Sequence, residues 1–245
     1  MIIALDFDGV VVDAIDECLL VSWNTFNGKG YQQFNKNTLE SIPRSFREKF
    51  LNYRSYVRHD GHFIVPYYLN DEVFVNKDSF ENVYSRISTS DKDRFRNSFI
   101  EYRIKVRNTY PKVWTSLHKF LMDIETLLNS GNEFIIVSGK DSSSIHFLLC
   151  MIGVEFPISK IYGRMTNKSE TLKSINNKAY MKGEKFIFID DNLDNVKEAI
   201  NNDIPSVWAE WGYNTKEQFC EAKQLKIPSL KQKDLSDLIK SLHQY

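Results

Sequence analysis

Two carboxylates directly follow a short apolar strand at the N-terminus, and this constrains the fold more than any other feature of the chain. Residues 1–5 are apolar, and Asp6 and Asp8 open the run Asp-Phe-Asp-Gly-Val-Val-Val-Asp. Successive strand side chains alternate, so both acids should project the same way if the extended geometry continues. Like charges that close repel, which predicts a cation, a proton or a reaction between them. A solvated acidic turn is the alternative.

Length and charge narrow the class of protein. At 245 residues the chain can bury a full core, and it fits one large domain or a core with a smaller inserted domain. Lys plus Arg and Asp plus Glu number 32 each, which argues against strong attraction to nucleic acid or an anionic membrane. No apolar run approaches the ~20 residues that span a bilayer.

Cysteine usage and the N-terminus both favour a cytoplasmic location. Cys18, Cys150 and Cys220 are far apart and odd in number, which indicates neither a zinc site nor a disulfide framework. Asp6 also stands where a signal peptide would carry its apolar stretch. We therefore expect a cytoplasmic protein whose partner is a small molecule, and neither nucleic acid nor a membrane.

From residue 111 onward, apolar strands alternate with amphipathic helices. This order is typical of an α/β fold, a doubly wound Rossmann-like parallel sheet with helices on both faces. Pro111 and Gly131 should bound the first helix, in which Val113, Leu117 and Phe120 share one apolar stripe. The further elements expected are strands over 134–137, 161–162, 186–189 and 205–208, with helices ending near 153, over 169–178 and starting near 192–194.

Residues 15–110 have a different character, with few strand-like runs and much Arg, Asn, Tyr and Phe. Helical periodicity occurs near 17–27, 40–57, 79–87 and 92–107. We interpret this segment as a helical insertion into the α/β core. The predicted domains are therefore a core of residues 1–14 and 111–245, and a helical domain of residues 15–110.

Polar residues follow three of the predicted strands. Asp6 and Asp8 follow the first, Ser138 follows the second, and Asp190 with Asp191 ends a third. In a doubly wound sheet, ligands bind outside the carboxyl ends of the strands, where the strand order reverses. Lys168 opens an intervening helix and adds an ammonium group. Four carboxylates, a hydroxyl and an ammonium in one cleft are suited to binding a phosphate together with a divalent cation.

These four motifs, in this order, resemble the haloacid dehalogenase-like (HAD) superfamily. The motifs are residues 6–13, Ser138 after its strand, Lys168 before its helix, and Ile-Asp-Asp-Asn-Leu-Asp-Asn-Val at 189–196. The resemblance covers roughly residues 1–14 and 111–212, and is to the phosphatase branch with an inserted helical cap, similar to phosphoglycolate phosphatase and beta-phosphoglucomutase. It implies a phosphatase that hydrolyses a small phosphorylated metabolite.

The resemblance also implies a role for each motif residue. Asp6 would attack phosphorus and form an aspartyl-phosphate. Asp8 would protonate the leaving group and then take a proton from the attacking water. Lys168 would balance the charge on Asp6 and on the phosphate, while Ser138 and the backbone near Gly139 would donate hydrogen bonds to the phosphoryl oxygens.

A magnesium ion is the implied cofactor. Its expected ligands are the Asp6 carboxylate, the Asp8 backbone carbonyl and Asp191, with Asp190 as a neighbouring group or an alternative ligand. The fourth motif departs from the commoner Gly-Asp form, because Asp190 stands where Gly is frequent. Asn195 likewise stands where a second Asp often follows. Lys160 competes with Lys168 for the lysine role, but Lys168 precedes the helix start that the family shows there.

The helical segment should select the substrate. Arg and His interleave with Phe and Tyr between residues 44 and 62, which predicts an amphipathic helix whose basic face is mostly solvated. A lid that excludes water and selects the leaving group would use some of these cations. The hypothesis is that Arg54, Arg58 or His59 contacts an anionic part of the substrate.

Two rival functions remain at this stage. A phosphomutase uses the same groups and returns the phosphoryl group to a bound intermediate, so the motifs do not separate it from a phosphatase. A non-catalytic binding module on the same scaffold is the second rival. A dehalogenase or a phosphonate hydrolase would lack the acid at Asp8, so Asp8 together with Asp190 and Asp191 argues against both.

Overall fold

The computed structural model describes residues 1–69 and 76–235, and the chain divides into two compact units. The α/β unit comprises Met1–Asp13 and Phe120–Tyr245, and the helical unit comprises Ala14–Lys119. The predicted boundaries were 14/15 and 110/111, whereas the structure has them at 13/14 and 119/120. Ala14 and residues 111–119 therefore lie in the helical unit and not in the core. Residues 70–75 of the predicted helical domain and 236–245 of the predicted core lie outside the described residues.

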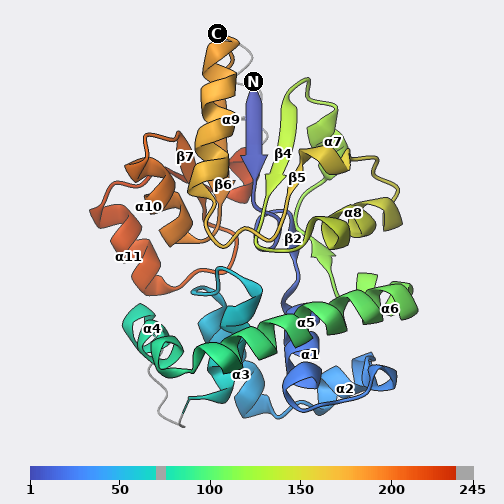
Figure 1. The fold of residues 1–245 in the computed structure, drawn as a ribbon. Coiled ribbons are helices and arrows are strands. Elements are labelled where there is room, and N and C mark those ends of the chain that lie inside the picture. Colours follow the sequence, from blue (N-terminus) through green and yellow to red (C-terminus); the bar gives the residue numbers. More distant parts are fainter. Residues whose placement is uncertain (70–75, 236–245) are drawn as a thin grey trace. The chain divides into compact units, whose positions relative to one another are not determined.

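A six-stranded sheet forms the centre of the α/β unit (Figure 1). Its strand order is β5-β4-β1-β6-β7-β8, and all of its neighbouring strands pair in parallel. The predicted fold class is therefore confirmed. The strands are β1 (Ile2–Leu5), β4 (Glu133–Val137), β5 (Ile161–Tyr162), β6 (Phe186–Asp190), β7 (Ser206–Ala209) and β8 (Ser229–Leu230).

Helices cover both faces of this sheet. They are α7 (Ile124–Leu128), α8 (Ser142–Met151), α9 (Ser169–Met181), α10 (Leu193–Asn201) and α11 (Lys216–Gln224). Alternate strand residues face opposite ways, and the two sets meet different helices. Ile2, Ala4 and Phe188 belong to a core cluster with Leu172 of α9 and Ala199 of α10. On the other face, Leu5, Phe134 and Ile136 line an apolar pocket together with Ile124 and Leu127 of α7 and Leu149 of α8.

The single helix predicted between Pro111 and Gly131 is wrong. The segment forms α6 (Pro111–Thr115), then β3 (Lys119–Phe120), then α7. β3 pairs with β2 (Val12–Asp13) in a separate two-stranded sheet, and Leu121 N donates to Val11 O at 2.9 Å. Asp123 then caps α7 by accepting a hydrogen bond from Thr126 N at 3.1 Å. Pairing with a strand more than a hundred residues away overrides the local helical periodicity.

The helical unit contains the predicted helical segments. They are α1 (Ile15–Phe26), α2 (Lys36–Ser41), α3 (Arg44–Arg54), α4 (Lys77–Arg86) and α5 (Thr89–Thr109), with a 3₁₀ stretch over Asp60–Tyr67. The predicted segment 40–57 corresponds to parts of two helices, because Pro43 favours extended backbone in the residue before it. The unit's core includes stacked rings of Phe50, Phe63 and Phe99, whose centroids are 5.5 Å and 5.2 Å apart in sequence order.

A buried ion network also lies inside the helical unit. The Arg103 side chain is 1% exposed, and it donates to Glu17 Oε1 and to Asp60 Oδ1, each at 2.8 Å. Trp114 Nε1 donates to the same Glu17 oxygen at 3.1 Å, which ties α6 to α1. This contact explains why the segment after Pro111 belongs to the helical unit.

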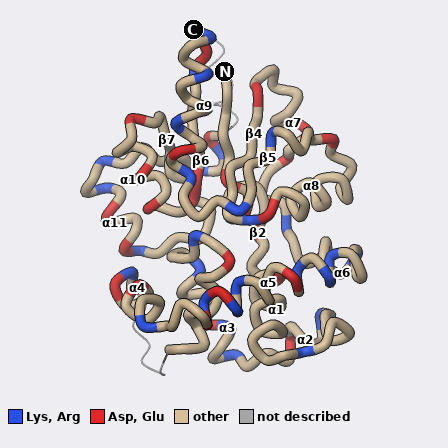
Figure 2. Tube along the Cα trace, in the orientation of Figure 1, with Lys and Arg blue, Asp and Glu red and all other residues tan. Residues whose placement is uncertain are grey.

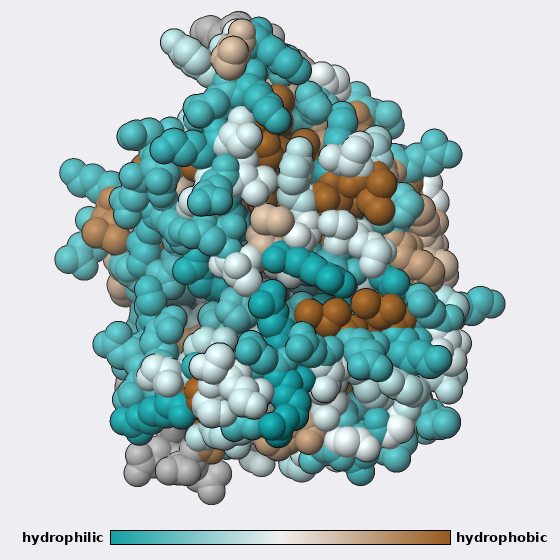
Figure 3. Space-filling model, in the orientation of Figure 1, coloured by the Kyte–Doolittle hydropathy of each residue, from teal (hydrophilic) through white to brown (hydrophobic). Residues whose placement is uncertain are grey.

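Charges of both signs are interspersed along the chain (Figure 2), and the face seen in Figure 3 is mainly hydrophilic with small apolar patches. Within the described part of the chain, the most exposed large apolar residues are Tyr180 and Met181 at the end of α9, 83% and 85% exposed. Among residues 1–69 and 76–235, no helix combines the length and the apolar character that crossing a membrane requires.

Candidate active site

The sheet topology brings three strand ends together. β1 lies between β4 and β6. After β1 the chain adds β4 and β5 on one side of it, and then β6, β7 and β8 on the other side, so the strand order reverses at β1. Leu5 pairs with Ile136 of β4 and with Ile189 of β6. Asp6 therefore follows β1 beside the end of β4, which precedes Ser138, and beside Asp190, the last residue of β6.

The segment after β1 turns sharply and does not continue the strand. Asp6 N still donates a hydrogen bond to Ile189 O at 2.9 Å, but Val11 N and Val12 N both donate to Phe7 O. Phe7 N also donates to the side-chain oxygen Oδ1 of the neighbouring Asp6 at 2.7 Å. The prediction that Asp6 and Asp8 project the same way required extended geometry as far as Asp8, and that condition is not met, because a hydrogen-bonded turn begins at Phe7.

Three buried carboxylates form a cluster at this edge of the sheet. Asp6, Asp190 and Asp191 each offer one carboxylate oxygen, and these oxygens lie within 4.8 Å of one another. Lys168 Nζ lies 3.0 Å from Asp6 Oδ1 and 2.7 Å from Asp190 Oδ2. Ser138 also donates a side-chain hydrogen bond to Asp6. The structure therefore brings together five of the predicted site residues, with Asp190 as a direct partner of the lysine.

Burial dominates the electrostatics of this cluster. Desolvation raises the pKa of Asp6 from 3.8 to about 6, against the opposing charge of Lys168, while the Asp190 charge adds to the rise. For Lys168, burial opposes the charged form, but the Asp190 and Asp6 carboxylates outweigh it and raise the pKa of the ammonium group. The lysine therefore stays charged, whereas Asp6 is readily protonated when no further cation is present.

The two adjacent aspartates have different surroundings, and those of Asp190 are protein donors. Asp190 Oδ2 accepts from Lys168 Nζ and from Asn195 Nδ2 at 2.9 Å, and Asp190 Oδ1 accepts from Asn192 N at 2.7 Å. The Asp190 side chain is fully buried. Asn195 stands where the resembled family often has an aspartate. It supplies an amide donor to Asp190, which an aspartate could not.

Asp191 is instead enclosed by closely approaching backbone. A Cβ atom on Gly9 would lie 2.2 Å from Asp191 Oδ2, and one on Gly212 would lie 2.2 Å from Asp191 Cβ. Gly9 also has a φ of +95°, which L side chains rarely adopt. Both positions therefore require glycine, and the chain brings the turn after β1 and the segment after β7 against this one carboxylate.

Aromatic residues hold this arrangement in place. Trp208 Nε1 donates to Asp191 O at 2.8 Å, and Tyr213 N donates to Asp191 Oδ2 at 2.7 Å. Trp211 Nε1 donates to Val10 O at 3.0 Å, in the turn after β1. The N–H groups of these three residues therefore fix the aspartate and the turn.

Asp8 lies outside the three-carboxylate cluster and pairs with a lysine that the sequence analysis did not consider. Lys140 Nζ lies 3.3 Å from Asp8 Oδ2, and the lysine side chain is 1% exposed. The only local signal was its position, two residues after Ser138 at the end of an apolar strand. Gly139 lies between the two in the same turn.

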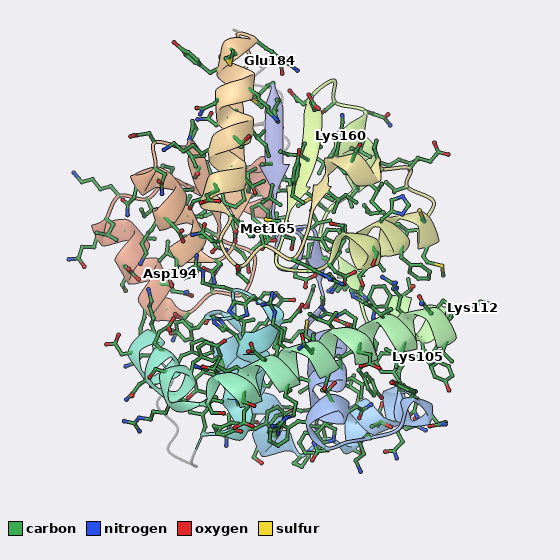
Figure 4. All side chains as sticks on the ribbon, in the orientation of Figure 1. Lys105, Lys112, Lys160, Met165, Glu184 and Asp194 are labelled. Atoms are coloured by element: carbon green, nitrogen blue, oxygen red, sulfur yellow. The ribbon has the colours of Figure 1, made fainter. Side chains whose placement is uncertain are left out.

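The preference for Lys168 over Lys160 agrees with the structure. Lys160 Nζ pairs with Glu133 Oε1 at 3.1 Å, and its side chain is 39% exposed. Glu133 opens β4 and Ser138 follows its last residue, so Lys160 pairs at the opposite end of that strand. Figure 4 labels Lys160 in the α/β unit.

Arg54 and Arg58 belong to the helical unit, and each contacts other residues of that unit. Arg54 is buried, and its guanidinium carbon lies 5.8 Å from the centroid of the Phe63 ring. Arg58 N donates to His62 Nδ1 at 3.3 Å. Burial, together with the charges of Arg96 and Arg58, lowers the pKa of His59 to about 4. His59 is therefore neutral near pH 7.

Solved structures with the same fold are numerous, although no protein-family model matches the chain and no curated protein does. A predicted phosphatase from Clostridium acetobutylicum superposes with a TM-score of 0.61 at 17% identity, over 100% of this chain and 98% of its own. A haloacid dehalogenase-like hydrolase from Streptococcus pneumoniae gives 0.59 at 16% identity, over 97% and 96%.

A predicted phosphoglycolate phosphatase from Haemophilus somnus is a third, with a TM-score of 0.58 at 12% identity, over 97% of this chain and 96% of its own. At such identities the likeness establishes the fold. The chain has the haloacid dehalogenase-like fold that the ordered motifs predicted, and these three structures match 97–100% of it.

Proposed function

We propose that this protein is a magnesium-dependent phosphatase that hydrolyses a small phosphorylated metabolite through an aspartyl-phosphate intermediate. The observation that carries the proposal is the convergence of Asp6, Asp190 and Asp191, all buried, on one point beside the charged Lys168. Structural neighbours described as phosphatases and as a hydrolase support the same reaction class.

The donor set fits a divalent cation. Among the described residues, the site holds four carboxylates, counting Asp8, and two ammonium groups, so two negative charges are in excess at full ionisation. Carboxylate and carbonyl oxygens are the ligands that Mg²⁺ prefers. We propose that Asp6, Asp191 and the Asp8 carbonyl hold the ion. When bound, the ion would neutralise charge that otherwise opposes the approach of an anionic phosphate to an anionic carboxylate.

Asp191 is the more suitable of the paired aspartates. Asp190 already accepts hydrogen bonds from Lys168, Asn195 and Asn192, so a cation there would compete with a buried ammonium group. Asp190 then serves to hold Lys168 beside Asp6. This division of roles gives a reason for two adjacent acids at the end of β6.

The chain's own residues supply the remaining chemistry. The Asp6 carboxylate attacks phosphorus and forms the acyl phosphate, while the bond from phosphorus to the leaving oxygen breaks and Asp8 protonates that oxygen. Water then attacks the same phosphorus, Asp8 takes its proton, and Asp6 is released as the carboxylate. Lys168, Ser138 and the backbone at Gly139 would donate to the phosphoryl oxygens as their charge changes.

The contribution of the helical unit to specificity stays a prediction. Arg54 and Arg58 belong to that unit, whereas the aspartates belong to the α/β unit. We propose that a cation of the helical unit recognises an anionic part of the metabolite.

The test measures release of inorganic phosphate from para-nitrophenyl phosphate and from a panel of phosphorylated metabolites, with Mg²⁺ and with a chelator. Asp6→Asn keeps the side-chain size but removes the nucleophile, so kcat should fall by at least about 10³-fold. Asp203→Asn is the matched control, because Asp203 is exposed with a φ of 58°, a conformation that Asn also tolerates.

Any of three results would contradict the proposal. Activity of Asp6→Asn within tenfold of the parent would exclude an aspartyl-phosphate at this residue. No turnover of any substrate by the folded, magnesium-loaded protein would favour a binding module. Exchange between sugar-phosphate isomers without phosphate release would instead identify a phosphomutase.

A further inference from the structure

Lys140 is a buried ammonium group for which the proposed reaction has so far no use. Its side chain is 1% exposed, and Nζ lies 3.3 Å from Asp8 Oδ2. Removing an ammonium group from water costs several kcal/mol, which a well-placed ion pair has to offset. A flexible lysine left to itself would extend into solvent. The buried position of Lys140 therefore suggests that its ion pair with Asp8 has a function.

The backbone around Lys140 is fixed from two sides. Lys140 N donates to Ser138 Oγ at 3.4 Å, and Arg164 N donates to Lys140 O at 3.0 Å. A Cβ atom on Gly163 would lie 2.6 Å from Lys140 O, so the segment after β5 packs directly on this turn. The end of β4 and the segment after β5 thus determine where the lysine side chain starts.

The two oxygens of Asp8 differ as a result. Oδ2 faces the Lys140 ammonium group, whereas Oδ1 is buried and accepts no hydrogen bond from any described residue. An unsatisfied buried oxygen is costly and calls for an explanation. A substrate oxygen or a water at the reacting phosphorus would supply the missing partner.

We propose, on the basis of the phosphatase function above, that Lys140 is a positioning residue for the general acid. By holding Oδ2 it fixes the orientation of the Asp8 carboxyl group, so that Oδ1 is the oxygen that carries the proton toward the leaving group. In the first step, the Oδ1–H bond breaks and the proton joins the leaving oxygen, which keeps the electron pair of its broken bond to phosphorus. Lys140 remains protonated and exchanges no proton.

The test uses a series of substituted phenyl phosphates and measures kcat/KM, which reports the step in which the phenol departs. A para-nitrophenolate leaves without help, whereas an unsubstituted phenolate needs the acid. In Lys140→Met, kcat/KM for phenyl phosphate should fall by about 10²-fold, since general acid catalysis contributes roughly 10²–10⁴-fold. The fall for para-nitrophenyl phosphate should be less than about tenfold. Lys140→Arg, which keeps a charged donor, should recover most of the loss.

Lys160→Met is the matched control, because it makes the same substitution at the exposed lysine that pairs with Glu133. This variant should leave kcat/KM unchanged for every substrate of the series. Should Lys140→Met fail to fold by its thermal transition, Lys140→Gln replaces it, with the same expected dependence on the leaving group.

Equal losses across the whole series would overturn the positioning role, because a lysine that contacts the phosphate or supports the fold acts on every substrate alike. Failure of Lys140→Arg to recover activity on phenyl phosphate would also overturn it. A parent protein inactive on the entire series would overturn the phosphatase proposal itself, and with it the role of Lys140, so the two failures can be told apart.

Discussion

Replacing Asp6 by asparagine should change how the stability of the metal-free protein depends on pH. Burial raises the pKa of Asp6 from 3.8 to about 6 in the folded protein. Protonated Asp6 therefore favours folding below pH 4, and this contribution is lost as the pH rises through 6. The difference between the two pKa values corresponds to at most about 3 kcal/mol. Asp6→Asn does not titrate and should not show this loss.

The assay is urea unfolding of parent and Asp6→Asn at pH 4, 5, 6 and 7 in the presence of a chelator. The free energy of unfolding of the variant minus that of the parent should rise by up to about 3 kcal/mol across this range. Effects of all other titrating groups largely cancel in the difference. Asp203→Asn, at an exposed position, should give a difference that stays level.

Magnesium should then reverse the effect in the parent. A ligand that binds only the folded state at a hundredfold excess over its Kd stabilises it by about 2.7 kcal/mol. We expect this gain at pH 7 in the parent and a smaller one in Asp6→Asn, which has lost one charged ligand. A difference that stays within about 0.5 kcal/mol between pH 4 and 7 would refute the argument that burial and repulsion destabilise the Asp6 carboxylate.

Two further substitutions separate the roles assigned above. Asp191→Asn should abolish the rise in Tm on adding Mg²⁺, with little change in the Tm of the metal-free protein. Asp190→Asn should instead lower the free energy of unfolding of the metal-free protein by about 2 kcal/mol, because it weakens the bond to Lys168. Equal effects of the two variants would contradict this division. In the helical unit, Arg103→Met leaves two buried carboxylates unpaired and should cost about 3–5 kcal/mol by urea unfolding. The exposed Arg44→Met, which breaks only the surface pair with Glu48, should cost under about 1 kcal/mol, and similar losses in both would refute the argument.

The sequence predicts the sheet and its polar edge because both depend on short-range patterns. The apolar runs of β1, β4 and β6 each end at a residue with a polar side chain, namely Asp6, Ser138 and Asp190. The carboxyl ends of parallel strands share one edge of the sheet, so these residues had to lie near one another.

Contacts between distant residues were beyond the sequence. Lys140 and Asp8 are 132 residues apart, and nothing near either residue marks them as a pair. The segment after Pro111 shows the same limit, because its helical spacing is real while its pairing with β2 depends on a strand at the other end of the chain. Predictions failed where a long-range hydrogen bond or ion pair competed with a local preference.

The paired aspartates show why the ligand could not be chosen from the motif alone. Adjacent residues at a strand end point to different sides, so Asp190 and Asp191 meet different neighbours. Asp190 faces Lys168 and Asn195, which come from the starts of α9 and α10, whereas Asp191 faces Gly9 and Gly212 from opposite parts of the chain. A cation at Asp190 would have to displace a buried ammonium group. The neighbours that the fold places around each aspartate therefore decide which of the two suits a cation. Two adjacent acids in the sequence do not reveal those neighbours.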